Sequence, residues 1–96
     1  MARVELSAAA AEDLDRLIVT HSLPGNTRAR VKASLRQLER FPRLGRELPG
    51  RWTDFRLLLG PWPWLLMIYL FLPDEGRVVV VTIQDARSSA AATAER

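Results

Sequence analysis

The chain has 96 residues, of which 48% are hydrophobic and 26% charged, with a formal net charge of +3 and no cysteine. This length and composition are typical of one globular domain and exclude an intrinsically disordered chain. The lack of cysteine excludes a disulfide framework and a thiolate metal site.

The first predicted elements are a short strand and an amphipathic helix. Residues 3–6 alternate polar and apolar side chains, and Ser7 is suited to cap the following helix. From Leu14 to His21, one helical face repeats at i, i+3, i+4 and i+7. His21 is the only histidine, and no activating partner stands near it in the sequence. We therefore expect neither catalysis by His21 nor a metal or cofactor.

A second helix is predicted over residues 27–41, with Asn26 as its cap and the Phe41-Pro42 pair as its end. Its apolar stripe comprises Val31, Leu35, Leu38 and Phe41. Another face carries basic residues at i, i+4 and i+8, namely Arg28, Lys32 and Arg36. The two helices are expected to form a hairpin over one face of a sheet, and residues 43–53 to form a connecting loop.

Three strands are predicted over residues 55–59, 64–72 and 77–83. Residues 64–72 are all apolar, which favours a central strand that is buried on both faces. A bilayer span needs about 20 such residues, so this run is too short to cross one. We assign Leu58, Leu65, Met67 and Phe71 to the sheet face away from the helices, where they would form an apolar patch.

The predicted fold class is therefore α+β, in the order β-α-α-β-β-β, with a helical hairpin packed on an antiparallel sheet. Residues 1–96 are expected to form one domain, with residues 88–96 as a flexible tail. The chain opens without the apolar run of a signal peptide, so we expect a soluble cytoplasmic protein.

Charge is concentrated in the middle third of the chain. Residues 28–56 contain nine basic groups and three acids, a net +6, whereas the flanking residues sum to −3. Such a surface attracts phosphates or an acidic protein partner. The alternative is a solvated helix face in a chain that uses arginine almost exclusively as its base.

One segment and the order of the elements carry a resemblance to a known family. Residues 38–49 contain a Pro-x-x-Gly-Arg-x-Leu loop, and an aromatic–Arg pair, a strand tyrosine and a basic residue follow it. The residues concerned are Pro42, Gly45, Arg46, Leu48, Phe55, Arg56, Tyr69 and Arg87. Over residues 3–87 the chain resembles the RelE/ParE superfamily of bacterial toxins.

The resemblance implies the toxin of a type II toxin–antitoxin pair. In that family the cognate antitoxin wraps an extended or helical segment around the sheet and helices of the toxin. RelE-type members cut mRNA on the ribosome with basic side chains, whereas ParE-type members inhibit DNA gyrase. A RelE-like reading assigns catalytic charge to Arg56, Arg87 and Arg51.

The sequence departs from the RelE pattern at three places. Leucine stands at position 58 where RelE-type strands usually have a base, residues 64–67 contain no arginine, and no tyrosine or histidine follows Arg87. Arginine is a poor general base. The chain is therefore placed nearer ParE, acting by binding a protein target such as DNA gyrase. A ribosome-dependent, metal-free mRNA endoribonuclease and a detoxified relative that only binds its antitoxin stay as alternatives.

Tryptophan and basic side chains are the candidates for partner binding. Trp62 lies between two prolines in a turn, close to Trp64 and Trp52, and an exposed tryptophan favours a protein interface. The assigned residues are Trp62, Trp64, Arg28, Lys32, Arg36 and Arg46. The expected partners are the antitoxin and either gyrase or the ribosome with its mRNA, without a membrane. A homodimer within the toxin–antitoxin complex is also compatible with this reading. Structural roles stay open for Arg56, as an ion pair with Asp54 or Asp85, and for Tyr69, as a buried hydroxyl.

Overall fold

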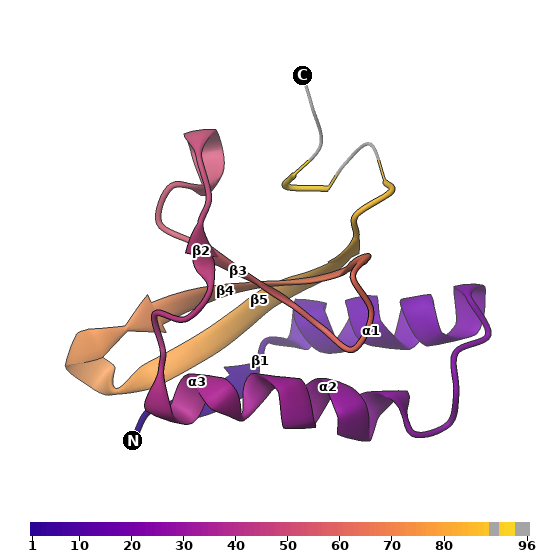
Figure 1. The fold of residues 1–96 in the computed structure, drawn as a ribbon, viewed down its shortest axis with the longest axis horizontal. Helices are drawn as coiled ribbons and strands as arrows, with labels where there is room; N and C mark the ends of the chain where they lie inside the picture. The colour runs from indigo at the N-terminus through magenta and orange to yellow at the C-terminus, as the bar shows by residue number, and fades with distance from the viewer. Residues whose placement is uncertain (89–90, 94–96) are drawn as a thin grey trace.

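The computed structural model of the chain describes residues 1–88 and 91–93. A twisted sheet lies above a layer of helices, and a loop and residues 86–88 and 91–93 lie on the opposite side of the sheet (Figure 1). The elements are β1 (Arg3–Leu6), α1 (Ala8–Thr20), α2 (Thr27–Leu35), α3 (Gln37–Arg40), β2 (Arg46–Glu47), β3 (Arg56–Leu59), β4 (Leu65–Leu72) and β5 (Arg77–Asp85), with short 3-10 turns η1 (Gly50–Trp52) and η2 (Pro73–Glu75).

The strand order is β1-β5-β4-β3-β2, which confirms the α+β class and the central place of β4. Strands β3, β4 and β5 form the predicted antiparallel meander. Strand β1 runs parallel to β5, from the pair Arg3↔Arg77 to Leu6↔Val80, so the sheet is mixed. A four-residue pattern does not encode strand direction, and a parallel neighbour needs only a long connection, which the rest of the chain supplies here.

The assignment of side chains to the two sheet faces is wrong. Leu65 and Met67 are fully buried against the helices, and Leu58 and Phe71 pack on the same side. The face away from the helices instead carries Leu57, Leu66 and Ile68. Both faces of β4 are apolar, so the sequence has no polar–apolar alternation that would show which residues face the helices.

The sheet face away from the helices is covered by two other parts of the chain. Leu48, from the predicted loop 43–53, packs on it together with Ala91, which is 1% exposed. The backbone N–H of Ala92 donates to the Gln84 side-chain oxygen at 2.8 Å. Flexibility of residues 88–96 stays a prediction, because 89–90 and 94–96 lie outside the described residues.

Two local features differ from the predicted elements. The second helix is divided at Arg36 into α2 and α3, and Phe41 is 61% exposed instead of buried in its stripe. In β5, Ile68 pairs with Thr82 and Tyr69 with Val80, which leaves Val81 as a bulge. Asp13 of α1 accepts hydrogen bonds at this bulge from the Thr82 hydroxyl (2.6 Å) and the Ile83 N–H (3.1 Å). No helix in the described part of the chain is both long and apolar enough to span a bilayer.

Amide hydrogen exchange should be slowest in β4, at residues 65–69. Each of these residues is buried and has a strand on both sides, so its amide opens only with the whole sheet. Exchange measured by mass spectrometry should rank β4 as most protected, above β1 and β2 at the sheet edges. Exchange in β4 as fast as in β2 would contradict this architecture.

Candidate functional site

The Pro-x-x-Gly loop is held on the sheet by the hydroxyl of Tyr69. This hydroxyl donates to the Pro42 carbonyl and accepts from the Gly45 N–H, both at 2.8 Å. Tyr69 is 0% exposed, and its burial, which outweighs the Gly45 hydrogen bond and the charge of Arg56, raises its pKa. Tyr69 is therefore a neutral structural group at physiological pH.

Only glycine fits at position 45. A Cβ there would lie 2.6 Å from the Leu57 carbonyl oxygen and 2.8 Å from two Tyr69 atoms, closer than real contacts allow. The proline and glycine of the motif are thus spaced so that one tyrosine hydroxyl satisfies two backbone groups of the loop.

Arg56 fastens the same loop from β3. Its guanidinium donates to the carbonyls of Gly45 (2.8 Å) and Arg43 (3.2 Å), and to the Glu47 carboxylate (3.2 Å). The ion-pair partner is therefore Glu47, and the Asp54 or Asp85 partner considered from sequence is wrong. We call Pro42, Gly45, Arg56 and Tyr69 the loop anchor.

A second cluster forms where β5 ends. The Arg87 guanidinium bonds both carboxylate oxygens of Asp85 at 2.9 Å and lies 4.7 Å from the centroid of the Trp64 ring. His21 is also 3.2 Å from Asp85 and 5.0 Å from Trp64. The bond from Arg87, more than any other effect, lowers the pKa of Asp85. This contact of His21 could not be predicted from the sequence, because Asp85 is far from it along the chain.

The tryptophans extend this cluster towards α2. Trp62 stacks on Trp64 with 5.8 Å between ring centroids and 12° between planes, and Arg30 lies 4.7 Å from the Trp62 centroid. We call Arg30, Trp62, Trp64 and Arg87 the aromatic row. Trp52, which was expected beside the other two, instead packs edge-on against Phe55 at 5.6 Å.

The structure does not bring together the three arginines that the RelE-like alternative assigns to catalysis. Arg56 pairs with Tyr69 on β4, whereas Asp85, just before Arg87, pairs with Leu65 on the other side of β4. Four residues of strand correspond to roughly 13 Å. Arg51 lies in η1 and is exposed. The assignment of these three residues to catalysis stays a prediction that this geometry does not favour.

The basic partner-binding candidates have different surroundings. Arg28 forms an ion pair with Asp15 of α1, and Arg46 is exposed on β2. Lys32 and Arg36 line a hollow between α2 and β1 and make no ion pair within residues 1–88 and 91–93.

Replacement of Tyr69 by Phe should destabilise the fold by about 1–3 kcal/mol, because the buried N–H of Gly45 loses its acceptor. Urea titration would measure the change. Gly45→Ala should cost about as much through overpacking. Gly25→Ala is the matched control, since its Cβ would have no neighbour within 4 Å. Equal stability of the Gly45 and Gly25 variants would contradict the loop anchor.

Stability should fall in acid partly through Asp85. Its pKa is lowered in the folded state, so its contribution is complete above the unfolded pKa and is lost as the pH falls through the folded value, below about pH 4. Asp85→Asn should therefore lower stability at pH 7 and flatten the stability curve below pH 4. A curve parallel to that of the unchanged chain would show that the Arg87 pair contributes nothing.

Comparisons with known proteins agree with the fold. No protein-family model matches the sequence, and no curated protein matches it. The chain is similar in structure to the isolated RelE toxin of E. coli (TM-score 0.68, 16% identity, 94% of this chain and 89% of that one). It is also similar to a chain of the RelBE2 toxin–antitoxin complex of Mycobacterium tuberculosis (TM-score 0.64, 21% identity, 88% of this chain and 96% of that one).

A third similar structure comes from the chromosomal ParDE system of P. aeruginosa (TM-score 0.69, 16% identity, 91% of this chain and 98% of that one). The likeness to this system and to RelE is about equal, so the fold does not favour the ParE side over the RelE side. The chain therefore has the fold of the RelE/ParE-type toxins.

Proposed function

We propose that this chain is the toxin of a type II toxin–antitoxin pair, neutralised by a cognate antitoxin, and that it acts in the cytoplasm by binding a protein target such as DNA gyrase. The fold supports the general part of this proposal, because three similar structures are of toxins or toxin–antitoxin systems. The choice of a protein target rests on the chemistry of the candidate site.

The choice of a protein target rests on one observation: the side chains that could take part in RNA cleavage are already hydrogen-bonded within the fold. Metal-free RNA cleavage needs one group to remove a proton from the 2′-OH, another to neutralise the phosphate and a third to protonate the leaving oxygen. Tyr69 is buried with both hydrogen bonds made, Arg56 holds the loop, and Arg87 is bonded to Asp85. None of these three is free to move a proton, and Arg51, the third arginine assigned to catalysis, is exposed but is a poor general base.

The lining of the groove on the far sheet face also supports a protein target. This groove, of about 560 Å³, is lined by β3 on one side and by Ala86 and Thr93 on the other. Its apolar lining includes Leu57, Leu66 and the half-exposed Leu44 and Leu59, and Arg46 is the one charged side chain among the described residues that line it. Apolar surface of this kind suits a protein partner better than an RNA backbone, which needs cations.

The aromatic row is the proposed contact for the target. Its tryptophans are half-buried and stack between Arg30 and Arg87 at the surface beside α2. Tryptophan and arginine are among the residue types that contribute most to protein interfaces. Arg28 and Arg46 would lie at the polar rim of such contacts.

The alternative function, a ribosome-dependent endoribonuclease, is favoured by one observation. Arg46 and Arg51 are exposed near the far sheet face, where RNA phosphates could reach them. A relative that has lost toxicity and only binds its antitoxin would have the same fold.

Two assays should separate the candidate functions. The purified chain should inhibit supercoiling by gyrase and should not cleave mRNA on translating ribosomes. Trp62→Ala should weaken inhibition by about tenfold or more, because it removes the centre of the aromatic row. Trp52→Ala is the matched control, since Trp52 packs on Phe55 outside the row.

Strong cleavage of mRNA that is lost in Arg51→Ala or Arg87→Ala would establish the nuclease instead. Arg56→Ala is unsuitable for this test, because loss of its bonds to the loop would impair folding as well as catalysis. Inactivity in both assays, together with tight binding of the antitoxin, would identify a detoxified relative.

A further inference from the structure

Basic side chains form a row along α2 and α3. Lys32, Arg36 and Arg40 follow one another at intervals of four residues, and each is exposed. Four residues correspond to about one turn, or roughly 6 Å along a helix axis, so the three cations lie on one side of the helix. Arg36 joins α2 to α3 with helical backbone angles (φ −59°, ψ −27°), and the row therefore continues across the junction. We call these three residues the basic face.

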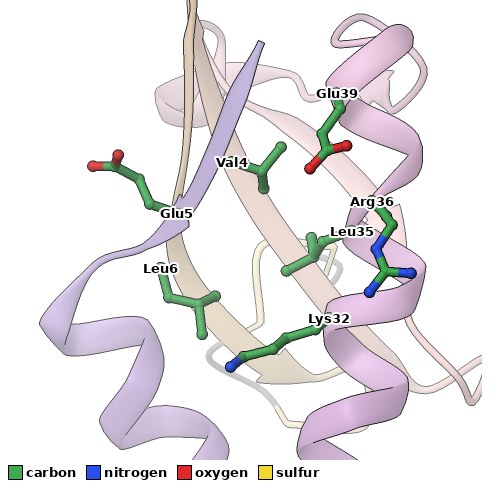
Figure 2. A pocket seen from close by; sticks show the side chains of 7 residues that line it. All are labelled: Val4, Glu5, Leu6, Lys32, Leu35, Arg36 and Glu39. Atoms are coloured by element: carbon green, nitrogen blue, oxygen red, sulfur yellow. The ribbon is translucent and has the colours of Figure 1, made fainter. Parts of the chain in front are cut away.

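The charge of the basic face is not neutralised within the described part of the chain. None of its three residues makes an ion pair there, whereas Arg28, one turn before Lys32, is paired with Asp15 of α1. Figure 2 shows Lys32 and Arg36 on successive turns, with Glu39 on the turn that follows. Glu39 is the one acid of α2 and α3, and it is half-buried while the cations are exposed. The surface therefore has a strong excess of positive charge.

The neutral residues around the basic face distinguish between two kinds of anionic partner. Ala29, Ala33 and Gln37 are exposed beside the cations, and within residues 28–40 no exposed apolar side chain is larger than alanine. Protein interfaces depend on large apolar or aromatic anchors and are depleted in lysine and alanine. Protein–DNA interfaces are more polar and much more positive, and most of their hydrogen bonds go to phosphate and sugar. This surface has the second composition.

We propose that the basic face binds the phosphate backbone of double-stranded DNA without regard to base sequence. Each of its cations would neutralise one phosphate, because a duplex carries charges at short, regular intervals along its axis. Recognition of RNA relies largely on unstacked bases that pack on aromatic side chains, and residues 28–40 include no aromatic residue. The charge row therefore fits DNA better than RNA.

The basic face contains none of the residues of the aromatic row or of the loop anchor. The inference therefore goes beyond the proposed function and does not depend on it. Where the protein target is DNA gyrase, an enzyme that acts on DNA, the aromatic row and the basic face would contact the same complex of protein and DNA.

The test measures binding of the full chain to a fluorescent DNA duplex of about two helical turns by fluorescence anisotropy. Three phosphate contacts predict an affinity that falls about 40-fold between 50 and 200 mM salt. Arg36→Gln removes one contact, so it should reduce this loss to about 12-fold and weaken binding to duplexes of different sequence equally. Arg36→Lys keeps the charge and should behave like the unchanged chain.

Arg3→Gln is the matched control, because it removes the same charge from a side chain that is 74% exposed. Val4 points towards α2 (Figure 2), so by alternation Arg3 lies on the other side of β1, away from the basic face. This variant should keep the 40-fold salt dependence. Equal effects of Arg3→Gln and Arg36→Gln would show that the net charge of the chain holds the DNA, and would overturn the basic face.

The remaining outcomes separate the ligand from the proposed function. Tighter binding of an RNA duplex of the same length would overturn the choice of DNA. Displacement of the DNA by poly-glutamate at an equal concentration of charge would overturn the phosphate chemistry in favour of an acidic protein. Binding as predicted by a chain that neither inhibits gyrase nor binds an antitoxin would establish the basic face and overturn the proposed function.

Discussion

The hydrogen bonds of the Tyr69 hydroxyl hold the loop between α3 and β2, and the cover of the sheet face away from the helices depends on them. A single buried oxygen joins the centre of β4 to the loop between α3 and β2, through Pro42 and Gly45. Arg56 adds bonds to the same loop from the neighbouring strand. Leu48 follows the loop after the two residues of β2 and packs on the sheet face away from the helices, so the cover of that face depends on where the loop is held. A buried hydroxyl with both partners present stabilises one arrangement, since any shift of the loop leaves polar groups unpaired.

This interaction changes the meaning of the family-like residues. Proline, glycine, the strand arginine and the strand tyrosine can be recognised in the sequence as one pattern, which is easily taken for a catalytic one. In three dimensions they form the loop anchor, and their spacing is explained by hydrogen bonding and by the lack of room for a Cβ at Gly45. Arg87 is likewise explained by Asp85 and Trp64. Resemblance at such positions is therefore evidence for a fold before it is evidence for a reaction.

Much of the architecture could be predicted from local signals, and the rest depended on contacts between distant residues. Turn residues and the length of the apolar run placed β4 in the middle of the meander. The same run gives no sign of the sheet face on which Leu65 and Met67 lie, because both faces of the strand are apolar. The direction of β1 and the bulge at Val81 have no local signal in the sequence. The contact between His21 and Asp85 likewise joins α1 to the end of β5, so reading along the chain could not reveal it.

The two edges of the sheet indicate how stability and binding are divided in this molecule. At the β2 edge the strand is short, its residues belong to the loop that Tyr69 and Arg56 hold, and Glu47 is itself paired with Arg56. At the β1 edge the backbone of Val4 and Leu6 is open, and the cations beside it have no internal partner in the described residues. A natural sheet usually blocks both edges, because an open edge invites aggregation. Charged side chains beside an edge oppose such pairing, and Lys32 and Arg36 stand next to β1 in this role.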